Sequence, residues 1–272
     1  MSTVFTTSRL LEFCSVAELT KQVGQEPQHW PLAIVKELTD NGLDACEEIG
    51  IAPNITIAIS KGSITVMDNG PGIAPETVNR LLDFNCKTSS REAYIGPTRG
   101  AQGNALQAII AMAFVIDGAK GDTVIEARGV THHVTFIIDL VRREPKIEHV
   151  QRRSSVQSGT RVTVHWPDSA CSQLVEAKSQ IVQIVRQFGW LNPHASFTLN
   201  WDGKRLLTTK ATDQSWRKWR PRDPAPAAWY DSESFGRLIA AWVAHDQDHG
   251  RDRTVREFIS RFRGLARSDV QK

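Results

Sequence analysis

This chain of 272 residues contains no run of about 18 apolar residues, so we expect no membrane-spanning helix. Its N-terminal segment, MSTVFTTSRLLEFCS, lacks a basic stretch followed by an apolar core, so we expect no signal peptide. Its four cysteines form no C-x-x-C pair, which argues against a zinc site and against a disulfide framework. These absences favour a cytoplasmic protein without a membrane partner.

A large charge imbalance is also missing from the chain as a whole, but the charges are unevenly distributed. The formal net charge is +3, and residues 203–272 carry 15 Lys and Arg against 9 Asp and Glu. The first 202 residues therefore sum to −3. The basic C-terminal region fits contact with DNA or another polyanion, and it fits a solvated basic helix equally well.

Tryptophans interleave with basic residues in this C-terminal region. The tryptophans are Trp216, Trp219 and Trp229, and the basic residues are Arg217, Lys218, Arg220 and Arg222. Such residues stack on bases and contact phosphates in proteins that bind single-stranded nucleic acid. They also pack linkers onto folded domains, and we favour packing as the interpretation.

Hydrophobic periodicity predicts helices and strands in mixed order. A long helix begins at HWPL, with Pro31 in its first turn, where the missing N–H is not needed. The segment NITIAISKGSITVMDNG alternates apolar and polar residues around Lys61 and Gly62, which predicts a β-hairpin. Further strands are predicted at DTVIEARG, HHVTFIIDL, TRVTVHW and ASFTLNWDG, and further helices at residues 8–24, APETVNRLLDF, NALQAIIAMAF and SQLVEAKSQIVQIVRQFGWL. The predicted class is α+β, with a mixed, mostly antiparallel sheet and helices on one face.

The pattern predicts three parts along the chain. Residues 1–202 form the α+β domain, including its N-terminal segment. Residues 203–231 are rich in proline and tryptophan and predict a linker. Residues 232–272 form a basic helical extension, with helices near 232–244 and 254–262.

The stretch KELTDNGLDA places a polar stripe on the long helix. At about 100° per residue, the stripe members fall within roughly 60° of one another; they are Glu37, Asn41, Asp44 and Glu48. The stripe itself contains no Lys or Arg to relieve repulsion between the acids. Asn and Asp oxygens suit Mg²⁺, and a Glu can act as a base toward water. An ordinary acidic helix surface is the competing interpretation, and the stripe alone does not decide between an ordinary surface and a functional site.

The segment MDNGPGI places an acid where an apolar residue is expected. Asp68 has the inward parity of Ile64 and Val66, and burying an unpaired carboxylate is costly, so a donor must reach it. Gly70 and Gly72 remove side chains just after it, as happens where backbone approaches a ligand closely. An acid that accepts from an exocyclic amine would explain both features. An Asx-type turn formed by Asp-Asn-Gly is the alternative.

The segment PTRGAQGNAL contains two glycines at a junction between a loop and a helix. Free backbone N–H groups and the helix dipole attract phosphate at such a place, here near Gly100 and Gly103. No G-K-[ST] follows, so this is not a Walker A sequence. A lone G-x-x-G is a weak signal.

The segment SGTRVTV places a hydroxyl among inward-facing residues. Thr160 shares the parity of Val162 and Val164. Its hydroxyl would either extend a polar network around a buried base or bond a neighbouring backbone carbonyl, which is the commoner case.

Taken in this order, the four motifs resemble those of the GHKL ATPase superfamily, which includes gyrase, Hsp90, histidine kinase and MutL proteins and has the Bergerat nucleotide-binding fold. ELTDNGLDA resembles the N box, DNGPGI the first glycine box, RGAQGNAL the second, and SGT the final Gly-Thr motif. The resemblance covers roughly residues 8–202. Within the superfamily the sequence is most similar to the B subunit of type IIB DNA topoisomerase (topoisomerase VI), through KELTDNGLDACEEIG, RGAQG and LNPHASFTLNWDG.

The resemblance implies an ATP site that uses Mg²⁺. Glu37 would polarise the water that attacks the γ-phosphate, Asn41 would hold Mg²⁺, and Asp68 would accept from the adenine amino group. The remaining implied ATP-binding residues are Asp44, Gly70, Gly72, Thr160 and, in a lid over the phosphates, Lys87, Gly100, Ala101, Gln102, Gly103 and Asn104. Asn104 departs from the family pattern, in which an apolar residue is more usual.

The resemblance also implies partners. Family members commonly dimerise when ATP binds, here through MSTVFTTSRLLEF and the closed lid, and DNA cleavage would come from a separate A-type subunit. Too few residues follow Trp201 for the family's transducer domain, which supplies a lysine to the γ-phosphate. We therefore expect a truncated or minimal B-type protein, or the N-terminal part of a longer one. The alternatives are an ATPase switch in a MORC-like, MutL-like or anti-phage defence assembly, and a nucleotide-binding module without catalysis.

Overall fold

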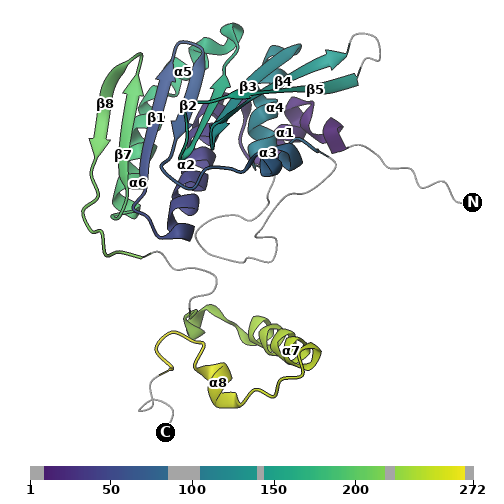
Figure 1. Ribbon diagram of the computed structural model, residues 1–272, viewed down its shortest axis with the longest axis vertical. Coiled ribbons are helices and arrows are strands. Elements are labelled where there is room, and N and C mark those ends of the chain that lie inside the picture. The colour runs from purple at the N-terminus through teal and green to yellow at the C-terminus, as the bar shows by residue number, and fades with distance from the viewer. Residues whose placement is uncertain (1–8, 85–104, 140–143, 218–223, 267–272) are drawn as a thin grey trace, which may run out of the picture. The chain divides into compact units, whose positions relative to one another are not determined.

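The computed structural model describes residues 9–84, 105–139, 144–217 and 224–266, and these fall into two compact units (Figure 1). The described residues up to 217 form the first unit, and residues 224–266 belong to the second.

The first unit is built on one mixed sheet. Its eight strands lie in the order β5-β4-β3-β6-β2-β1-β7-β8, and every neighbouring pair is antiparallel except β1 with β7. The strands are β1 (Asn54–Ser60), β2 (Ser63–Met67), β3 (Lys120–Ala127), β4 (Val130–Asp139), β5 (Glu144–Arg153), β6 (Thr160–His165), β7 (Ser196–Trp201) and β8 (Lys204–Thr209). The predicted α+β class is confirmed.

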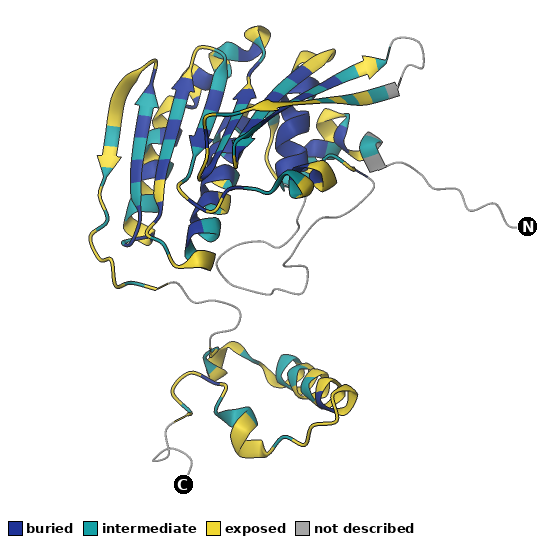
Figure 2. Ribbon diagram, viewed as in Figure 1, coloured by how far each residue is buried: buried dark blue, intermediate teal, exposed yellow. Residues whose placement is uncertain are grey.

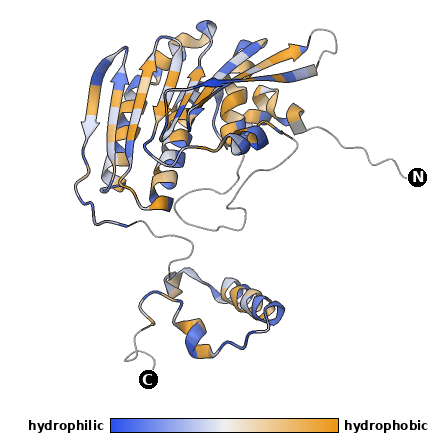
Figure 3. Cartoon of the chain, in the orientation of Figure 1, coloured by the Kyte–Doolittle hydropathy of each residue, from blue (hydrophilic) through white to orange (hydrophobic). Residues whose placement is uncertain are grey.

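Helices cover one face of this sheet, as Figure 1 shows. The α-helices are α1 (Val16–Val23), α2 (Trp30–Ile49), α3 (Pro75–Leu81), α4 (Ala105–Asp117), α5 (Cys171–Glu176) and α6 (Lys178–Leu191), with 3₁₀ turns η1 (Arg9–Phe13), η2 (Pro27–His29) and η3 (Asp168–Ala170). Each central strand alternates buried and half-buried residues, because successive side chains point to opposite faces (Figure 2). Figure 3 shows the same alternation as apolar and polar residues.

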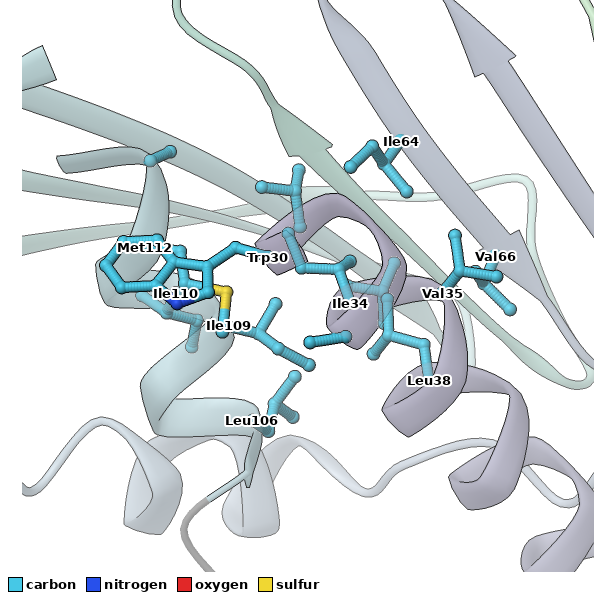
Figure 4. Close-up of a cluster of buried hydrophobic side chains, with 14 of the residues drawn as sticks. Trp30, Ile34, Val35, Leu38, Ile64, Val66, Leu106, Ile109, Ile110 and Met112 are labelled. Atoms are coloured by element: carbon cyan, nitrogen blue, oxygen red, sulfur yellow. The ribbon is translucent and has the colours of Figure 1, made fainter. Parts of the chain in front are cut away.

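The core lies between α2, α4 and the middle of the sheet. Figure 4 shows Trp30 of α2 beside Met112 of α4, and Val35 of α2 beside Val66 of β2. Trp30 is fully buried, and its indole N–H donates to the Gln25 carbonyl oxygen at 2.9 Å. This packing fixes the position of α2, and with it the position of the polar stripe.

Two helices predicted as continuous are interrupted. The helix predicted for residues 8–24 breaks at Ser15, which has an extended backbone and whose hydroxyl accepts from the Glu18 N–H at 3.2 Å. Ser15 therefore caps α1 and ends the 3₁₀ turn before it. The helix predicted for SQLVEAKSQIVQIVRQFGWL is divided into α5 and α6 at Ala177.

Neither edge strand, β5 or β8, is predicted from the sequence. β5 carries charged residues along much of its length, so a short apolar alternation does not stand out. β8 occupies residues 204–209, which the sequence analysis assigned to the linker. It is mostly exposed because only β7 pairs with it, and edge strands need no continuous apolar pattern.

The second unit is a small helical element. It contains the 3₁₀ turn η4 (Ala227–Trp229), α7 (Ser232–Asp248) and α8 (Val255–Ile259). Phe235, Phe258 and Phe262 pack together with ring centroids 5.5–5.9 Å apart. Both helices begin with a capping box. Across the described parts of both units, no helix combines the length and the apolar character needed to cross a membrane.

Candidate functional site

Asp68 stands directly after β2, and the backbone around it fixes its carboxylate. Its Oδ1 accepts from the Gly70 N–H at 2.7 Å and from the Thr160 N–H at 3.2 Å. Its own N–H donates to the Thr160 carbonyl oxygen at 3.0 Å. The Asx-type turn is therefore present, but it is one bond of a larger arrangement that joins β2 to β6.

The environment of Asp68 opposes its negative charge. Burial raises the pKa of the carboxyl above its usual value, although hydrogen bonds from Gly70 and Thr160 act in the opposite direction. In the part of the chain that the structure describes, no Lys, Arg or His forms an ion pair with it. A carboxylate with a raised pKa and no ion-pair partner among the described residues is suited to accept a hydrogen bond from a neutral donor, such as an amino group of a base.

Three glycines from three different segments crowd around Asp68. A Cβ atom on Gly42 of α2 would lie 2.9 Å from the Asp68 Cβ, and one on Gly70 would lie 2.9 Å from its Oδ1. A Cβ on Gly159 would collide with the Asp68 carbonyl oxygen. Neither Gly42 nor Gly159 is among the site residues predicted from the sequence. A glycine inside a helix is unfavourable, and that is the signal that could have identified Gly42.

The two glycines of the DNGPGI segment are explained by protein packing. The space beside Gly70 holds Asp68 and Ala45, and a Cβ on Gly72 would lie 2.8 Å from the Gly159 carbonyl oxygen. Gly72 also has a φ of +74°, which favours glycine. Close approach by a ligand, which the sequence analysis inferred from these residues, is not needed to explain them.

Thr160 connects the Asp68 turn to the segment that follows it. The residue is buried, and its Oγ1 accepts from the Ile73 N–H at 3.3 Å. Its hydroxyl also lowers the pKa of Asp68, although burial outweighs this influence. The hydroxyl therefore belongs to the network around the acid, and its predicted place around a nucleotide base stays a prediction.

Asn69 was not predicted as a site residue, yet its side chain joins three elements behind Asp68. Its Oδ1 accepts from the Asn54 N–H at 2.7 Å and from the Cys46 thiol at 3.2 Å, and its Nδ2 donates to the Ala52 carbonyl oxygen at 3.0 Å. Burial and the Asp68 charge raise the pKa of Cys46 to about 12, so this thiol stays protonated. Asn69 thereby holds the turn against α2 and β1.

The polar stripe of α2 divides into residues that are already engaged and one that is not. Lys36 Nζ lies 2.8 Å from Glu37 Oε1 and 3.2 Å from Asp40 Oδ2. The inference that no basic residue relieves repulsion along the stripe is therefore wrong for Glu37. The long side chain of Lys36 reaches Glu37 and Asp40 from a position beside the stripe. Asn41 is exposed, and within the described residues its amide has no hydrogen-bond partner. Asp44 is half-buried and has interactions of its own.

Helix α2 brings the stripe close to Asp68. Gly42, which packs against Asp68, follows Asn41 directly in the chain, and Ala45 packs against Gly70. Glu37 lies about one helical turn before Asn41. The structure thus brings together an amide oxygen that has no partner among the described residues, an acid paired with Lys36, and the half-buried acid of the β2 turn.

The remaining predicted residues lie in other parts of the fold or outside the residues that the structure describes. Trp216 stacks on His194 with centroids 4.5 Å apart, and His194 Nε2 lies 3.0 Å from Glu47 Oε1, so for Trp216 the packing interpretation is confirmed. The predicted lid residues Lys87, Gly100, Ala101, Gln102, Gly103 and Asn104 lie outside the described residues. Within the described ranges, no three His, Cys, Asp or Glu side chains are grouped to hold a metal ion.

Comparison with known families identifies the region that contains these residues. The profile described as "Histidine kinase-, DNA gyrase B-, and HSP90-like ATPase" matches residues 28–170, which include the α2 stripe, the β2 turn and the start of β6.

Two curated relatives and one solved structure give further similarities. The B subunit of type 2 DNA topoisomerase 6 from Archaeoglobus fulgidus is 34% identical over 61% of this chain and 28% of its own length. The Natronomonas pharaonis protein of the same name is 28% identical over 66% of this chain and 23% of its own. This chain therefore spans about a quarter of the length of these relatives. The ADP complex of the Aquifex aeolicus MutL ATPase domain is 20% identical, with a TM-score of 0.44 over 66% of this chain and 63% of that one.

Proposed function

This chain belongs to the family of histidine kinase-, DNA gyrase B- and HSP90-like ATPases, and from this premise we propose that its first unit binds ATP with Mg²⁺ and hydrolyses the γ-phosphate. The observation that carries the proposal is the state of Asp68. Its carboxylate is half-buried, fixed by two backbone donors, and without a cationic partner among the described residues.

Asp68 would read the base. Both backbone bonds end on Oδ1, so Oδ2 keeps lone pairs for the exocyclic amino group of adenine. Guanine presents a carbonyl oxygen at the corresponding position, and two acceptors facing each other repel. The site would therefore prefer adenine, because the wrong base leaves a buried carboxylate oxygen unpaired.

Asn41 would contribute the protein ligand for Mg²⁺. Its exposed amide offers an oxygen without a partner in the described residues, and Mg²⁺ is usually held by one or two protein oxygens together with substrate phosphates and water. The donor set thus fits an ion that arrives with the nucleotide. When bound, the ion would neutralise charge on the phosphates.

Glu37 would orient the attacking water and accept its proton. The carboxylate lies on the same face of α2 as Asn41, about one turn away. In the described state it is paired with Lys36 at 2.8 Å, so a productive site needs Glu37 Oε1 to exchange this contact for water. The pair favours a second candidate function, a nucleotide-binding module that hydrolyses ATP slowly or not at all.

The role in the cell follows from the relatives and remains part of the proposal. We infer that ATP binding closes two copies of this chain into a dimer, which acts as a clamp in a complex like that of topoisomerase VI. An A-type subunit would cleave DNA, and the basic C-terminal region would contact it. The similarity to the B subunits of two topoisomerase 6 enzymes supports this inference.

The test separates binding from catalysis. Titration calorimetry with a non-hydrolysable ATP analogue should show binding that depends on Mg²⁺ and is weaker for the matching GTP analogue. Glu37→Ala should keep this binding and lower phosphate release by about a hundredfold or more. Glu48→Ala, an exposed acid on the same helix, is the control. Binding without phosphate release by the wild type would favour the module, and no binding by the wild type would refute the ATP site.

Dimerisation has its own measurement. Light scattering should show a monomer without nucleotide and twice the mass with the ATP analogue. A mass that does not change with the analogue would contradict the clamp while leaving the ATP site in place.

A further inference from the structure

The turn between β3 and β4 uses an unfavourable residue. Arg128 and Gly129 connect the paired residues Ala127 and Val130, and their φ angles are +50° and +75°. A two-residue turn with both φ angles positive favours Asn, Asp or Gly, because other side chains clash with their own backbone there.

A second hairpin in the same sheet shows the usual solution. The turn between β7 and β8 is Asp202-Gly203, with φ angles of +47° and +74°. Both turns have positive φ angles at their two residues, and only the β3–β4 turn places a long cationic side chain at its first position. An unfavourable backbone conformation of this kind points to a function of the side chain.

The side chain of Arg128 reaches the loop that follows Asp68. Its Nε donates to the Pro71 carbonyl oxygen at 3.1 Å. Its stem lies over Gly72, because a Cβ on Gly72 would be 3.1 Å from the Arg128 Cγ. The side chain therefore contacts two consecutive residues of the loop.

The contacts of Arg128 add to two hydrogen bonds that hold the loop at its two ends. The Gly70 carbonyl oxygen accepts from the Gly159 N–H at 2.8 Å, and the Ile73 N–H donates to Thr160 Oγ1 at 3.3 Å. Between these two points the Pro71 carbonyl is held by Arg128. Without Arg128, the segment from Pro71 to Gly72 has no polar bond to the rest of the sheet among the described residues.

We propose that Arg128 is a positioning residue for nucleotide recognition, which holds the loop after Asp68 so that the carboxylate is preorganised for the base. This inference rests on the proposed ATP site. Preorganisation raises affinity because the loop loses less conformational freedom when the ligand binds. A role in the turn alone is the opposing explanation, and it predicts that Asn would serve better than Arg.

Two substitutions distinguish these explanations. Arg128→Asn removes the donor and relaxes the turn, whereas Arg128→Met removes the donor but keeps an unfavourable residue in the turn. Lys61→Asn is the control, because it removes an exposed positive charge from another hairpin turn. Each variant is measured for its dissociation constant with a non-hydrolysable ATP analogue and for its melting temperature.

Both Arg128 variants should bind the analogue about tenfold more weakly than the wild type, and the control should bind as the wild type does. The melting temperature should rise or stay unchanged for Arg128→Asn and should not rise for Arg128→Met. Affinity would then fall in both variants whatever the change in stability, which a merely structural role does not predict.

Wild-type affinity in Arg128→Asn would overturn the inference while leaving the ATP site intact. If that variant does not fold, the affinity of Arg128→Met decides in the same way. A wild type that binds no nucleotide would refute the proposed function itself, and the inference with it.

Discussion

Asp68 and Glu37 are the two acids on which the proposed function depends, and the protein holds them in different ways. Asp68 is half-buried among three glycines and receives two backbone hydrogen bonds. Glu37 is part of an exposed helix face, and Lys36 is the residue that engages it. We call the region around Asp68 the base end and the region around Glu37 the phosphate end.

The difference corresponds to what each end would have to do in the proposed function. Discrimination between bases needs an acceptor whose position and direction do not change, so the base end is fixed by backbone atoms that have few alternatives. The phosphate end has to admit a metal ion, water and a charged group that changes during the reaction. Side chains with freedom to exchange partners suit this task, because an exposed ion pair is weak.

The largest expected effect concerns the rigidity of the base end. Gly159→Ala should lower the free energy of unfolding by about 3 kcal/mol or more, because the new Cβ collides with the Asp68 carbonyl oxygen and φ is +74°. Urea denaturation measures the change.

Gly203→Ala is the matched control for this substitution. Its φ is also +74°, but a Cβ there meets nothing within 4 Å. It should cost about 1 kcal/mol, which is the effect of the left-handed backbone alone. Equal losses in the two variants would show that the crowding around Asp68 is easily relieved, and the base end would then not be rigid.

The next effect separates the structural and the recognition roles of Asp68. In Asp68→Asn, the side-chain oxygen can still accept from Gly70 and Thr160, but the second oxygen becomes an NH₂ group that faces the amino group of adenine. Affinity for the ATP analogue should fall about a hundredfold, or about 2.7 kcal/mol, by titration calorimetry. Retained affinity would show that Asp68 does not read the base.

The same variant should show a pH-dependent gain in stability. Because burial raises the pKa of Asp68 in the folded state, the folded protein binds this proton more tightly than the unfolded chain does. The contribution of Asp68 to stability therefore falls as pH rises from the unfolded pKa of about 3.9 through the raised folded pKa. The melting temperature of Asp68→Asn relative to the wild type should rise across this window and then stay constant.

Asp122→Asn is the control with the opposite sign. Burial acts to raise the pKa of Asp122, but bonds from Lys120 and Thr135 outweigh it and lower the pKa. The folded protein therefore releases this proton more readily than the unfolded chain, and the bonds stabilise it above the unfolded pKa. Asp122→Asn should lose stability relative to the wild type as pH rises, and equal slopes for the two variants would contradict both assignments.

The central part of the fold could be predicted from the sequence, and its edges could not. Alternation in β1, β2 and β6 and the apolar face of α2 reflect one buried face, so they are visible in a single chain. β5 and β8 pair on one side only, and their exposed residues carry no such constraint. The divisions at Ser15 and Ala177 depend on local caps and on packing that hydrophobic periodicity does not record.

For the site, the sequence identified Asp68 and Thr160 as polar residues at inward-facing positions but not what surrounds them. Gly159 approaches Asp68 across the β2–β6 pair, and such a contact between distant segments has no signature at either position. Lys36 was overlooked because helix geometry places its Cα outside the stripe, whereas its long side chain reaches Glu37 and Asp40.

The smallest expected effect lies at the phosphate end. Lys36→Met keeps the apolar stem and removes the charge that pairs with Glu37 and Asp40. Lys36 and Glu37 are 50% and 37% exposed, so solvent screens the pair, and the free energy of unfolding should fall by less than about 1 kcal/mol. Lys21→Met, which breaks the more exposed pair with Glu18, is the control and should cost no more.

The same substitution tests whether Lys36 restrains Glu37. The pKa of Lys36 is raised, because Glu37 and Asp40 outweigh the opposing influence of burial, so the ammonium stays charged beside the acid. Removing it should leave Glu37 Oε1 available to water, and we expect phosphate release to rise about twofold to tenfold with little change in affinity for the ATP analogue. A loss of stability above about 2 kcal/mol would show instead that the phosphate end is as firmly built as the base end, and the contrast between them would not hold.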